Sequence, residues 1–320
     1  MWHQYLLIWR ILLVSLLLSG CVKQIKSIVS NPIDSFKMES VGNGIYVHHG
    51  EHIDIDEGYQ GDICNISFVV GSLGVAVIDT GGSLKVGKQL RQAIQKITDK
   101  PILYVINTHV HPDHIFGNAA FLQINGLEPQ FVGHAKLAAA MQLREVAYRK
   151  LNSKYLGVDV QGSDIVKPTI MVESRIELSL GDRTLTITPH PNAHTNTDIS
   201  IIDSQTGTLF TGDLLFIERT PVVDGDIKGL IATIDVLKTY PVQQLVPGHG
   251  PVTRQWLQAL NNQQRYLNTL LNDIRANIKA GKSMENTMDT AAESERNNWQ
   301  LFEITNRRNV NTIYPALEWE

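Results

Sequence analysis

The stretch that decides the fold is His109-Val110-His111-Pro112-Asp113-His114. Three imidazoles and one carboxylate fall within six residues, directly after the apolar run from Ile102 to Ile106. Because Pro112 keeps this segment from being a regular helix, we expect a loop at the end of a buried strand. Neutral imidazole and carboxylate suit borderline cations such as zinc. The stretch therefore predicts the centre of a metal site.

Three later residues repeat this placement. His194, Asp213 and His249 each follow an apolar, strand-like run. If the strand ends share one edge of a sheet stack, these side chains can converge on the 109–114 loop. Taken alone, each of these residues would be weak evidence for a metal site. Four other histidines are expected at the surface or in the core: His3, His48, His49 and His52.

Composition limits the class of protein. With 320 residues, 43% of them hydrophobic, the chain can bury the core of one large domain or two ordinary ones. The 28 basic and 32 acidic side chains leave a net charge of −4, and no long Lys/Arg run is present. Nucleic acid is therefore not expected as a partner.

The N-terminus has the pattern of a targeting segment. Residues 5–18 are almost wholly apolar and lead into Leu18-Ser19-Gly20-Cys21, which resembles the bacterial lipobox. We expect a lipoprotein signal peptide over 1–20, lipidation at Cys21 and a membrane-anchored protein of the bacterial cell envelope facing the periplasm. The alternative is an uncleaved anchor, although a spanning helix needs about 20 apolar residues. Cys64, in an apolar run, is expected to be a buried small hydrophobe.

The rest of the chain predicts a layered α/β fold. Residues 22–40 lack periodicity and are expected to be a tether. Strands are predicted at 45–47, 66–70, 75–78, 102–106, 176–180, 185–188, 199–202, 208–210 and 245–246. Helices are predicted at 84–98, 134–151, 230–239 and 253–279. Two batches of strands, each followed by helices, favour two packed sheets with helices outside.

The motifs together resemble a known family. The 109–114 run, Ala193-His194, Thr211-Gly212-Asp213 and Pro247-Gly248-His249 resemble, in order, the signature of the metallo-β-lactamase fold superfamily. This resemblance implies a four-layer αββα sandwich over residues 41–252 with a C-terminal helical extension over 253–320.

The resemblance also implies a set of metal ligands. One metal would lie on His109, His111 and His194, and a second on Asp113, His114 and His249, with Asp213 bridging them. Asp213 makes the site similar to the glyoxalase II type of dinuclear centre, and His111 in place of Glu counts against the flavodiiron branch. Asp79 resembles the family's acid that braces the metal loop, although an ordinary turn aspartate is an open alternative.

A narrower similarity concerns function. The segments 107–121, 213–216 and 221–225 are similar to exported zinc metallohydrolases that accompany quinoprotein dehydrogenases. This implies two Zn²⁺ ions per chain, with iron or manganese as alternative occupants, and a periplasmic quinoprotein dehydrogenase system as partner. Water ionised by the metals and oriented by Asp113 or Asp213 would cleave a small ester, thioester, lactone or amide. Weaker candidates for contact with this small-molecule substrate are Asn118, His134 and Arg219, for which helix starts and a surface charge are equally good explanations.

Two other functions stay open. Related sequences with His-x-His-x-Asp-His bind one iron and oxidise persulfides, so a mononuclear persulfide dioxygenase-like oxidoreductase is the first alternative. A non-catalytic metal-binding envelope lipoprotein is the second. The metal content separates the first alternative from a hydrolase, because two zinc ions favour hydrolysis and a single iron with oxygen consumption does not.

Overall fold

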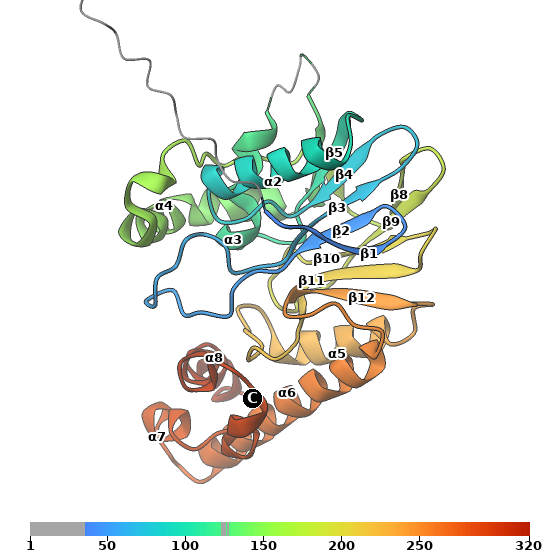
Figure 1. Cartoon of the computed structure of the whole chain (residues 1–320). Helices are drawn as coiled ribbons and strands as arrows, with labels where there is room; N and C mark the ends of the chain where they lie inside the picture. The colour runs from blue at the N-terminus through green and yellow to red at the C-terminus, as the bar shows by residue number, and fades with distance from the viewer. Residues whose placement is uncertain (1–35, 123–125, 127) are drawn as a thin grey trace, which may run out of the picture. The chain divides into compact units, whose positions relative to one another are not determined.

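The structure, a computed structural model, describes residues 36–122, 126 and 128–320. The predicted signal peptide 1–20, the lipidation site Cys21 and most of the predicted tether lie outside these residues. Two β-sheets pack face to face, and helices lie along their outer sides (Figure 1).

The first sheet has seven strands that follow one another in chain order. The strands β1 to β4 pair in antiparallel fashion, whereas β4 to β7 pair in parallel. Their bounds are β1 Glu39–Gly42, β2 Ile45–His48, β3 Ile66–Val70, β4 Val75–Ile78, β5 Ile102–Ile106, β6 Gln130–His134 and β7 Ile170–Val172. Because parallel strands carry their carboxyl ends to the same edge of a sheet, the loops after β4 and β5 are neighbours.

The second sheet has five strands in the order β12-β11-β10-β9-β8. All pairs are antiparallel except β11 with β12, which run in parallel. The bounds are β8 Ile176–Ser179, β9 Thr184–Pro189, β10 Ile199–Asp203, β11 Thr208–Phe216 and β12 Gln244–His249. The register of β11 against β12 shifts at Gly212 and again before Phe216, so the strand is irregular around Asp213.

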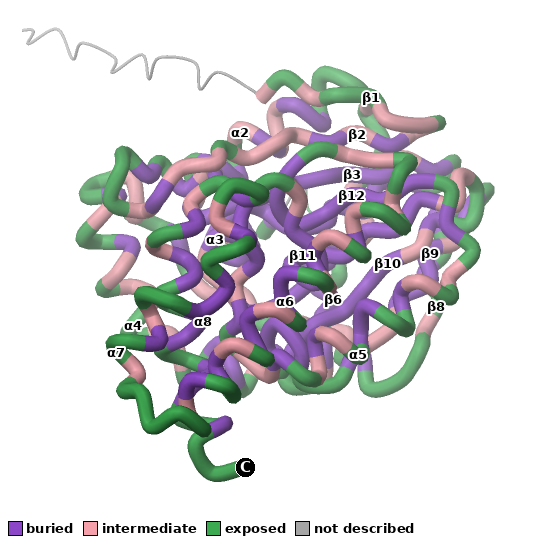
Figure 2. The backbone as a smooth tube through the Cα atoms, turned by 90° about the horizontal axis from the view of Figure 1, so that it is seen from below, coloured by how far each residue is buried: buried purple, intermediate pink, exposed green. Residues whose placement is uncertain are grey.

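The core between the sheets is built from both inner faces. Ile78, Ile106 and Val132 of the first sheet belong to the same buried cluster as Ile201 and Phe210 of the second. Figure 2 shows the strands largely buried and the outward sides of the helices exposed. Burial of apolar side chains between two sheets supplies much of the stabilisation of such a sandwich.

Helices form the two outer layers. The first sheet is covered by α2 Leu84–Ile97, whose buried residues pack on the strands. Along the chain, α2 is followed by α3 Pro112–Ile115, η1 Asn118–Phe121, α4 Leu137–Leu156 and η2 Gly157–Val160. The second sheet is covered by α5 Ile227–Leu237 and α6 Trp256–Lys279, followed along the chain by α7 Met284–Met288, η3 Glu293–Asn298 and α8 Phe302–Leu317. The predicted αββα architecture with a C-terminal helical region is confirmed.

The C-terminal helices share a core with the sandwich. Leu260 and Leu267 of α6 and Val310 of α8 lie in one buried cluster with Leu209 and Leu245 of the second sheet. The backbone of Thr253 also pairs with Leu245. The extension is therefore packed on the domain through a continuous apolar contact and has no separate core of its own.

Several predicted boundaries were wrong. The sheet begins at Glu39, inside the expected tether, because the polar edge strand β1 pairs through its backbone and shows no apolar alternation. The strand β11 runs on to Phe216, past the predicted end at Phe210, because its polar residues are buried. Strand β7 was not predicted, and of β6 only Phe131 and Val132 were recognised as strand-like. None of the helices within the described residues is long and apolar enough to cross a membrane.

Candidate metal centre

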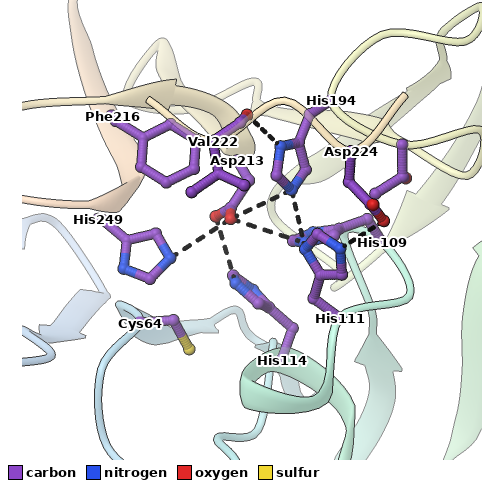
Figure 3. A network of polar contacts seen from close by, with 12 residues as sticks. Cys64, His109, His111, His114, His194, Asp213, Phe216, Val222, Asp224 and His249 are labelled. Atoms are coloured by element: carbon purple, nitrogen blue, oxygen red, sulfur yellow. Dashed lines mark hydrogen bonds and ion pairs between the residues drawn. The ribbon is translucent and has the colours of Figure 1, made fainter. Parts of the chain in front are cut away.

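The seven residues expected to bind metals lie together at one edge of the sheet stack. Figure 3 labels six of them, all except Asp113. Four come from the loop and short helix after β5, and His194 comes from the β9–β10 loop. Asp213 lies within β11, and His249 ends β12. Residues separated by up to 140 positions in the sequence thus meet because the strand ends converge.

The carboxylate of Asp213 occupies the middle of the cluster. Its Oδ2 lies 3.3 Å from Nε2 of His194 and 3.3 Å from Nε2 of His249. Its Oδ1 lies 3.2 Å from Nε2 of His114, and Oδ2 lies 3.7 Å from Nε2 of His109. Separations of this size between donor atoms fit side chains arranged around a small ion.

The donor atoms form three groups, of which two share Asp213 and the third contains Cys64, Asp113 and His114. The first contains His109, His111, His194 and Asp213, and the second contains His114, Asp213 and His249. Asp113 adjoins the second group, because its Oδ2 lies 3.5 Å from Nε2 of His114 and 3.6 Å from Nε2 of His249. The first group contains the ligands that the resemblance implied for one metal, together with Asp213, and the assignment of Asp113 to the second metal stays a prediction.

Each histidine is held from behind through its other ring nitrogen. The carbonyl oxygens of Val222 and Ile63 lie 2.8 Å and 2.6 Å from Nδ1 of His194 and His249. The remaining contacts are Thr108 Oγ1 with His109 Nδ1, Asp224 Oδ2 with His111 Nε2 and Asp79 Oδ2 with His114 Nδ1. Such outer hydrogen bonds fix the tautomer and aim the free nitrogen at the metal.

Asp79 braces the metal loop. Its Oδ1 accepts a hydrogen bond from the backbone N–H of Thr108 (2.8 Å), and its Oδ2 contacts Thr108 Oγ1 (2.7 Å) and His114 Nδ1 (2.8 Å). The residue is buried and has φ = +57°, a left-handed conformation that Asp tolerates better than most residues. This arrangement has the role that the resemblance implied for Asp79.

The donor set fits metal ions. His109 Nε2, His114 Nε2 and Asp213 Oδ1 are buried and have no hydrogen-bond partner among the described residues. Leaving such atoms unsatisfied costs about 1–3 kcal/mol each, and an ion in the centre would satisfy all three. Imidazoles with carboxylates form the kind of ligand set that zinc, iron and manganese accept.

The electrostatics of the metal-free cluster point the same way. Burial lowers the pKa of His194 to about 4 and that of His109 well below its ordinary value. Burial alone would raise the pKa of Asp213, but His249, His114 and His109 hold it well below its usual range. His109 and His194 are therefore neutral and Asp213 is ionised near neutral pH, which are the protonation states that metal binding requires.

His114 behaves differently from these two histidines. Burial would lower its pKa, but the carboxylates of Asp213, Asp113 and Asp79 raise that pKa well above its usual value. In the metal-free chain this imidazole is doubly protonated and charged near neutral pH, and a bound ion would replace one of the two protons. Metal binding at this residue therefore releases a proton.

Two candidate substrate residues have partners within their own loops. Asn118 is fully buried, and its side-chain amide forms hydrogen bonds with Thr80 and Asn107, so Asn118 stabilises the loop. His134 accepts a hydrogen bond from the backbone N–H of Lys136, and it also interacts with His190. A polar residue near a site can equally serve the local backbone, and a substrate contact of either residue stays a prediction.

Three neighbours of the cluster were missed or misread. Asp224 lies in a segment noted for its similarity but was given no role. Cys64 is buried as expected, yet its thiol contacts the Asp113 carbonyl and its sulfur groups with Asp113 and His114. His52 was expected at the surface or in the core. Burial lowers its pKa most, and the charges of His249 and Arg219 lower it further. No sequence pattern marks His52, because only the tertiary fold brings its loop here.

A cavity of about 650 Å³ opens beside His111. Its wall includes Tyr148 and Leu151 of α4, Val223 and Asp224 of the loop after β11, and Ile304 and Arg308 of α8. The C-terminal extension therefore forms one side of the space next to the metal cluster. Such a mostly apolar cavity with a few polar groups is typical of small-molecule sites.

Comparison with known proteins identifies the family. The model of the metallo-β-lactamase superfamily matches residues 59–260, more than half of the chain. The protein belongs to this superfamily, as the motifs and the sandwich fold predicted.

The relatives in sequence are named as hydrolases. A hydroxyacylglutathione hydrolase from a Polaromonas species is 31% identical over 185 residues, which cover 55% of this chain and 60% of the relative. A human acyl-coenzyme A thioesterase is 26% identical over 244 residues, 68% of this chain and 82% of the relative. A linear primary-alkylsulfatase from a Pseudomonas species is 43% identical over 49 residues, 15% of this chain and 9% of the relative.

Solved structures share the fold. The stereoselective inverting sec-alkylsulfatase from a Pseudomonas species has a TM-score of 0.70 at 16% identity, covering 87% of this chain and 50% of that one. The metallo-β-lactamase from Pontibacter korlensis has a TM-score of 0.58 at 19% identity, covering 72% of this chain and 98% of that one. The chain thus spans about half the length of the alkylsulfatase structure and less than two thirds of the hydroxyacylglutathione hydrolase.

Proposed function

We propose that the protein is a hydrolase with two zinc ions that cleaves a small ester, thioester, lactone or amide. The observation that carries this proposal is the pair of donor groups that share Asp213. One group of this kind would suffice for a mononuclear iron centre, whereas the second group, with its own braced histidines, favours two ions. The names of the relatives in sequence support the hydrolysis of an ester or thioester.

The bound metals would supply an ionised water near neutral pH and would polarise the bond to be cleaved. His109, His111 and His194 would hold one ion, and Asp113, His114 and His249 the other, with Asp213 between them. The iron and manganese alternatives use the same donors.

Two carboxylates would also act in the reaction. Asp113 and Asp213 lie among the imidazoles, where each can orient water through the oxygen that faces the cluster. The chain needs no serine or cysteine nucleophile, and burial and the adjacent carboxylates raise the pKa of the Cys64 thiol well above its usual value. A thiol that stays protonated is a poor nucleophile.

The metal stoichiometry of single variants tests the bridged arrangement. Elemental analysis of the purified wild type is expected to give about two zinc ions per chain. His194→Ala and His249→Ala should each retain about one ion, whereas Asp213→Ala should retain fewer than either. His48→Gln is the matched control, because His48 pairs with Asp62 outside the cluster, and it should keep both ions. A wild type with one iron and oxygen consumption would refute the proposal.

The catalytic part is tested with a substrate panel. The zinc-loaded protein should cleave members of a set of thioesters, lactones, β-lactams and sulfate esters, and His111→Ala should lose that activity. If two zinc ions are present and nothing in the panel is cleaved, the non-catalytic metal-binding role is favoured.

We also propose export and anchoring through a lipid at Cys21, supported by the apolar run 5–18 and the lipobox-like Leu18-Ser19-Gly20-Cys21. Cys21→Ser should move the protein from the membrane to the soluble fraction of the cell envelope. An unchanged membrane fraction would favour the uncleaved anchor. A quinoprotein dehydrogenase partner stays a prediction, for which co-purification from solubilised membranes is the measurement.

A further inference from the structure

The loop 217–226 contacts two of the expected metal ligands from outside the cluster. It joins β11 to α5 and has no helix or strand of its own. The carbonyl of Val222 accepts a hydrogen bond from Nδ1 of His194 (2.8 Å), and Oδ2 of Asp224 lies 3.0 Å from Nε2 of His111 (Figure 3). The backbone N–H of Asp224 also donates to the carbonyl of His194 (3.1 Å). A displacement of this loop would therefore be passed to both imidazoles.

Asn309 of α8 holds this loop on either side of Val222. Its Nδ2 donates to the carbonyl of Pro221 (2.7 Å), and its Oδ1 accepts from the backbone N–H of Val223 (2.9 Å). In an extended segment these two backbone groups point to one side, and the carbonyl of the residue between them points to the other. Asn309 and His194 thus hold opposite edges of the same residue.

The side chain of Asn309 is itself fixed. It is 1% exposed, and its Nδ2 also lies 2.9 Å from Oη of Tyr266 on α6. The next residue, Val310, packs in the buried cluster that joins the extension to the second sheet. A side chain on a packed helix positions its partners more precisely than one on a loop does. Asn309 therefore connects the helical core of the extension to the edge of the metal cluster.

A second contact with the extension ends before Val222. The backbone of Gln300 pairs with Arg219, and its carbonyl accepts from the N–H (3.0 Å) and hydroxyl (2.7 Å) of Thr220. Arg219 is buried at this point, which excludes the solvated surface charge that the sequence allowed. Beyond Thr220, the hydrogen bonds between α8 and this loop, among the described residues, are those of Asn309.

Packing alone does not explain these bonds. Asn306, one turn earlier on α8, is buried to the same degree, at 2% exposed. Its amide bonds with Tyr266 (3.0 Å) and with the carbonyl of Ala291 (2.8 Å), both within the extension. A buried amide that served only the helical core could be satisfied there, as Asn306 is. Asn309 instead directs two of its hydrogen bonds at the loop beside the metal ligands.

We propose that Asn309 is a positioning residue of the metal centre, which aims His194 and His111 at their ion by holding the loop 217–226. The inference rests on the metal site of the proposed function and goes beyond it, because it makes the C-terminal extension part of that site. Loss of an outer partner of a metal ligand weakens metal binding about 10- to 100-fold. Asn309 acts through one further peptide group, so we expect the lower end of this range, about tenfold.

Competition between a chromophoric chelator and the zinc-loaded full chain measures this effect. The phase of the ion held by His109, His111 and His194 is the one that His194→Ala lacks. Asn309→Leu keeps the size of the side chain and removes both bonds to the loop. It should weaken zinc binding in that phase about tenfold or more and leave the other phase within about threefold of wild type.

Asn306→Leu is the matched control. In the chelated protein both leucine variants should melt below wild type by similar amounts, because each leaves buried backbone groups without partners. Asn306→Leu should nevertheless keep both zinc affinities. If a leucine variant does not fold, Asn309→Ala and Asn306→Ala replace the pair, since truncation cannot overpack the core, and the same contrast is expected.

A spectroscopic measurement reports the geometry of the ligands directly. Cobalt(II) in place of zinc absorbs visible light in a way that depends on the arrangement of its ligands. The absorption spectrum of the cobalt-loaded chain should change in Asn309→Leu and stay as in wild type in Asn306→Leu. A variant that was only less stable would keep the wild-type spectrum.

The outcomes separate this inference from the proposed function. If two zinc ions bind and no ester is cleaved, the hydrolase function fails and the selective loss of one zinc phase in Asn309→Leu still supports the positioning role. If wild type binds a single ion, the two-ion proposal fails, and the inference stands only if that ion is lost in His194→Ala and weakened in Asn309→Leu. Unchanged zinc affinities and cobalt spectrum in Asn309→Leu, or equal changes in Asn306→Leu, would overturn the inference.

Discussion

Replacing Asp79 by asparagine isolates the charge behind the metal loop. Asparagine has the same size and tolerates the left-handed backbone (φ = +57°) as well as aspartate does. The change turns one acceptor oxygen into a donor NH₂ group, so the three contacts with Thr108 and His114 cannot all be kept. The backbone should therefore stay in place while the support of His114 is lost.

The size of the effect follows from these contacts. The contact between Asp79 Oδ2 and His114 Nδ1 is 2.8 Å long, and a hydrogen bond to a charged group contributes about 1.5–3 kcal/mol. Loss of such an outer partner weakens metal binding about 10- to 100-fold, which corresponds to about 1.4–2.7 kcal/mol. The two ranges agree, and the loss should fall on the ion held by His114 more than on the ion held by His109, His111 and His194.

Competition with a chromophoric chelator measures this prediction, since two zinc ions of unequal affinity give a biphasic curve. One of the two phases, that of the ion held by His114, should shift about 10- to 100-fold in Asp79→Asn, and the other should change much less. Asp235→Asn is the control, because Asp235 is an exposed acid on α5 and should leave both phases unchanged. A variant whose two zinc affinities stay within about threefold of wild type would refute the bracing role, given the range expected for an outer ligand partner.

Three further predictions concern stability. An added Cβ at Gly117 would lie 1.9 Å from Thr80 O, so Gly117→Ala should lower the free energy of unfolding by about 3 kcal/mol or more. Gly281→Ala is the control: its Cβ would have open space, and only the positive φ should cost about 1 kcal/mol. Equal losses of the two variants in urea titrations would contradict this account. Burial lowers the pKa of His190 from 6.5 to about 4 in the folded chain. Between these two pH values the unfolded chain therefore binds more protons than the folded chain, and stability decreases as the pH is lowered. From pH 7.5 to 5.0 the chelated wild type should lose about 2 kcal/mol more than His190→Asn, and parallel pH profiles would exclude this role. Zinc removal by a chelator should lower the melting temperature of wild type more than that of Asp213→Ala, because only the wild type binds the ions tightly; equal shifts in calorimetry would mean that the ions lie elsewhere.

Local sequence was sufficient for the metal motif and most of the elements. The run 109–114 could be interpreted without a structure because its donors are neighbours along the chain and its flanking strand is strongly apolar. The helix 84–98 and the strands 66–70 and 75–78 were predictable for the same reason, since apolar periodicity reflects burial. Elements with little apolar periodicity, such as β1, were missed because they pair through the backbone.

Only the tertiary structure decided which polar side chains serve the site. Asn118 and Arg219 are both polar residues near a metal ligand in sequence. Asn118 forms hydrogen bonds inside the loop, whereas Nε and Nη1 of Arg219 are buried without a hydrogen-bond partner among the described residues. His52 and Gln300 come from opposite ends of the chain and meet beside the cluster. Sequence fixes the chemistry that a residue can offer, whereas its partners depend on how distant strand ends and the C-terminal helices pack, and this information is not local.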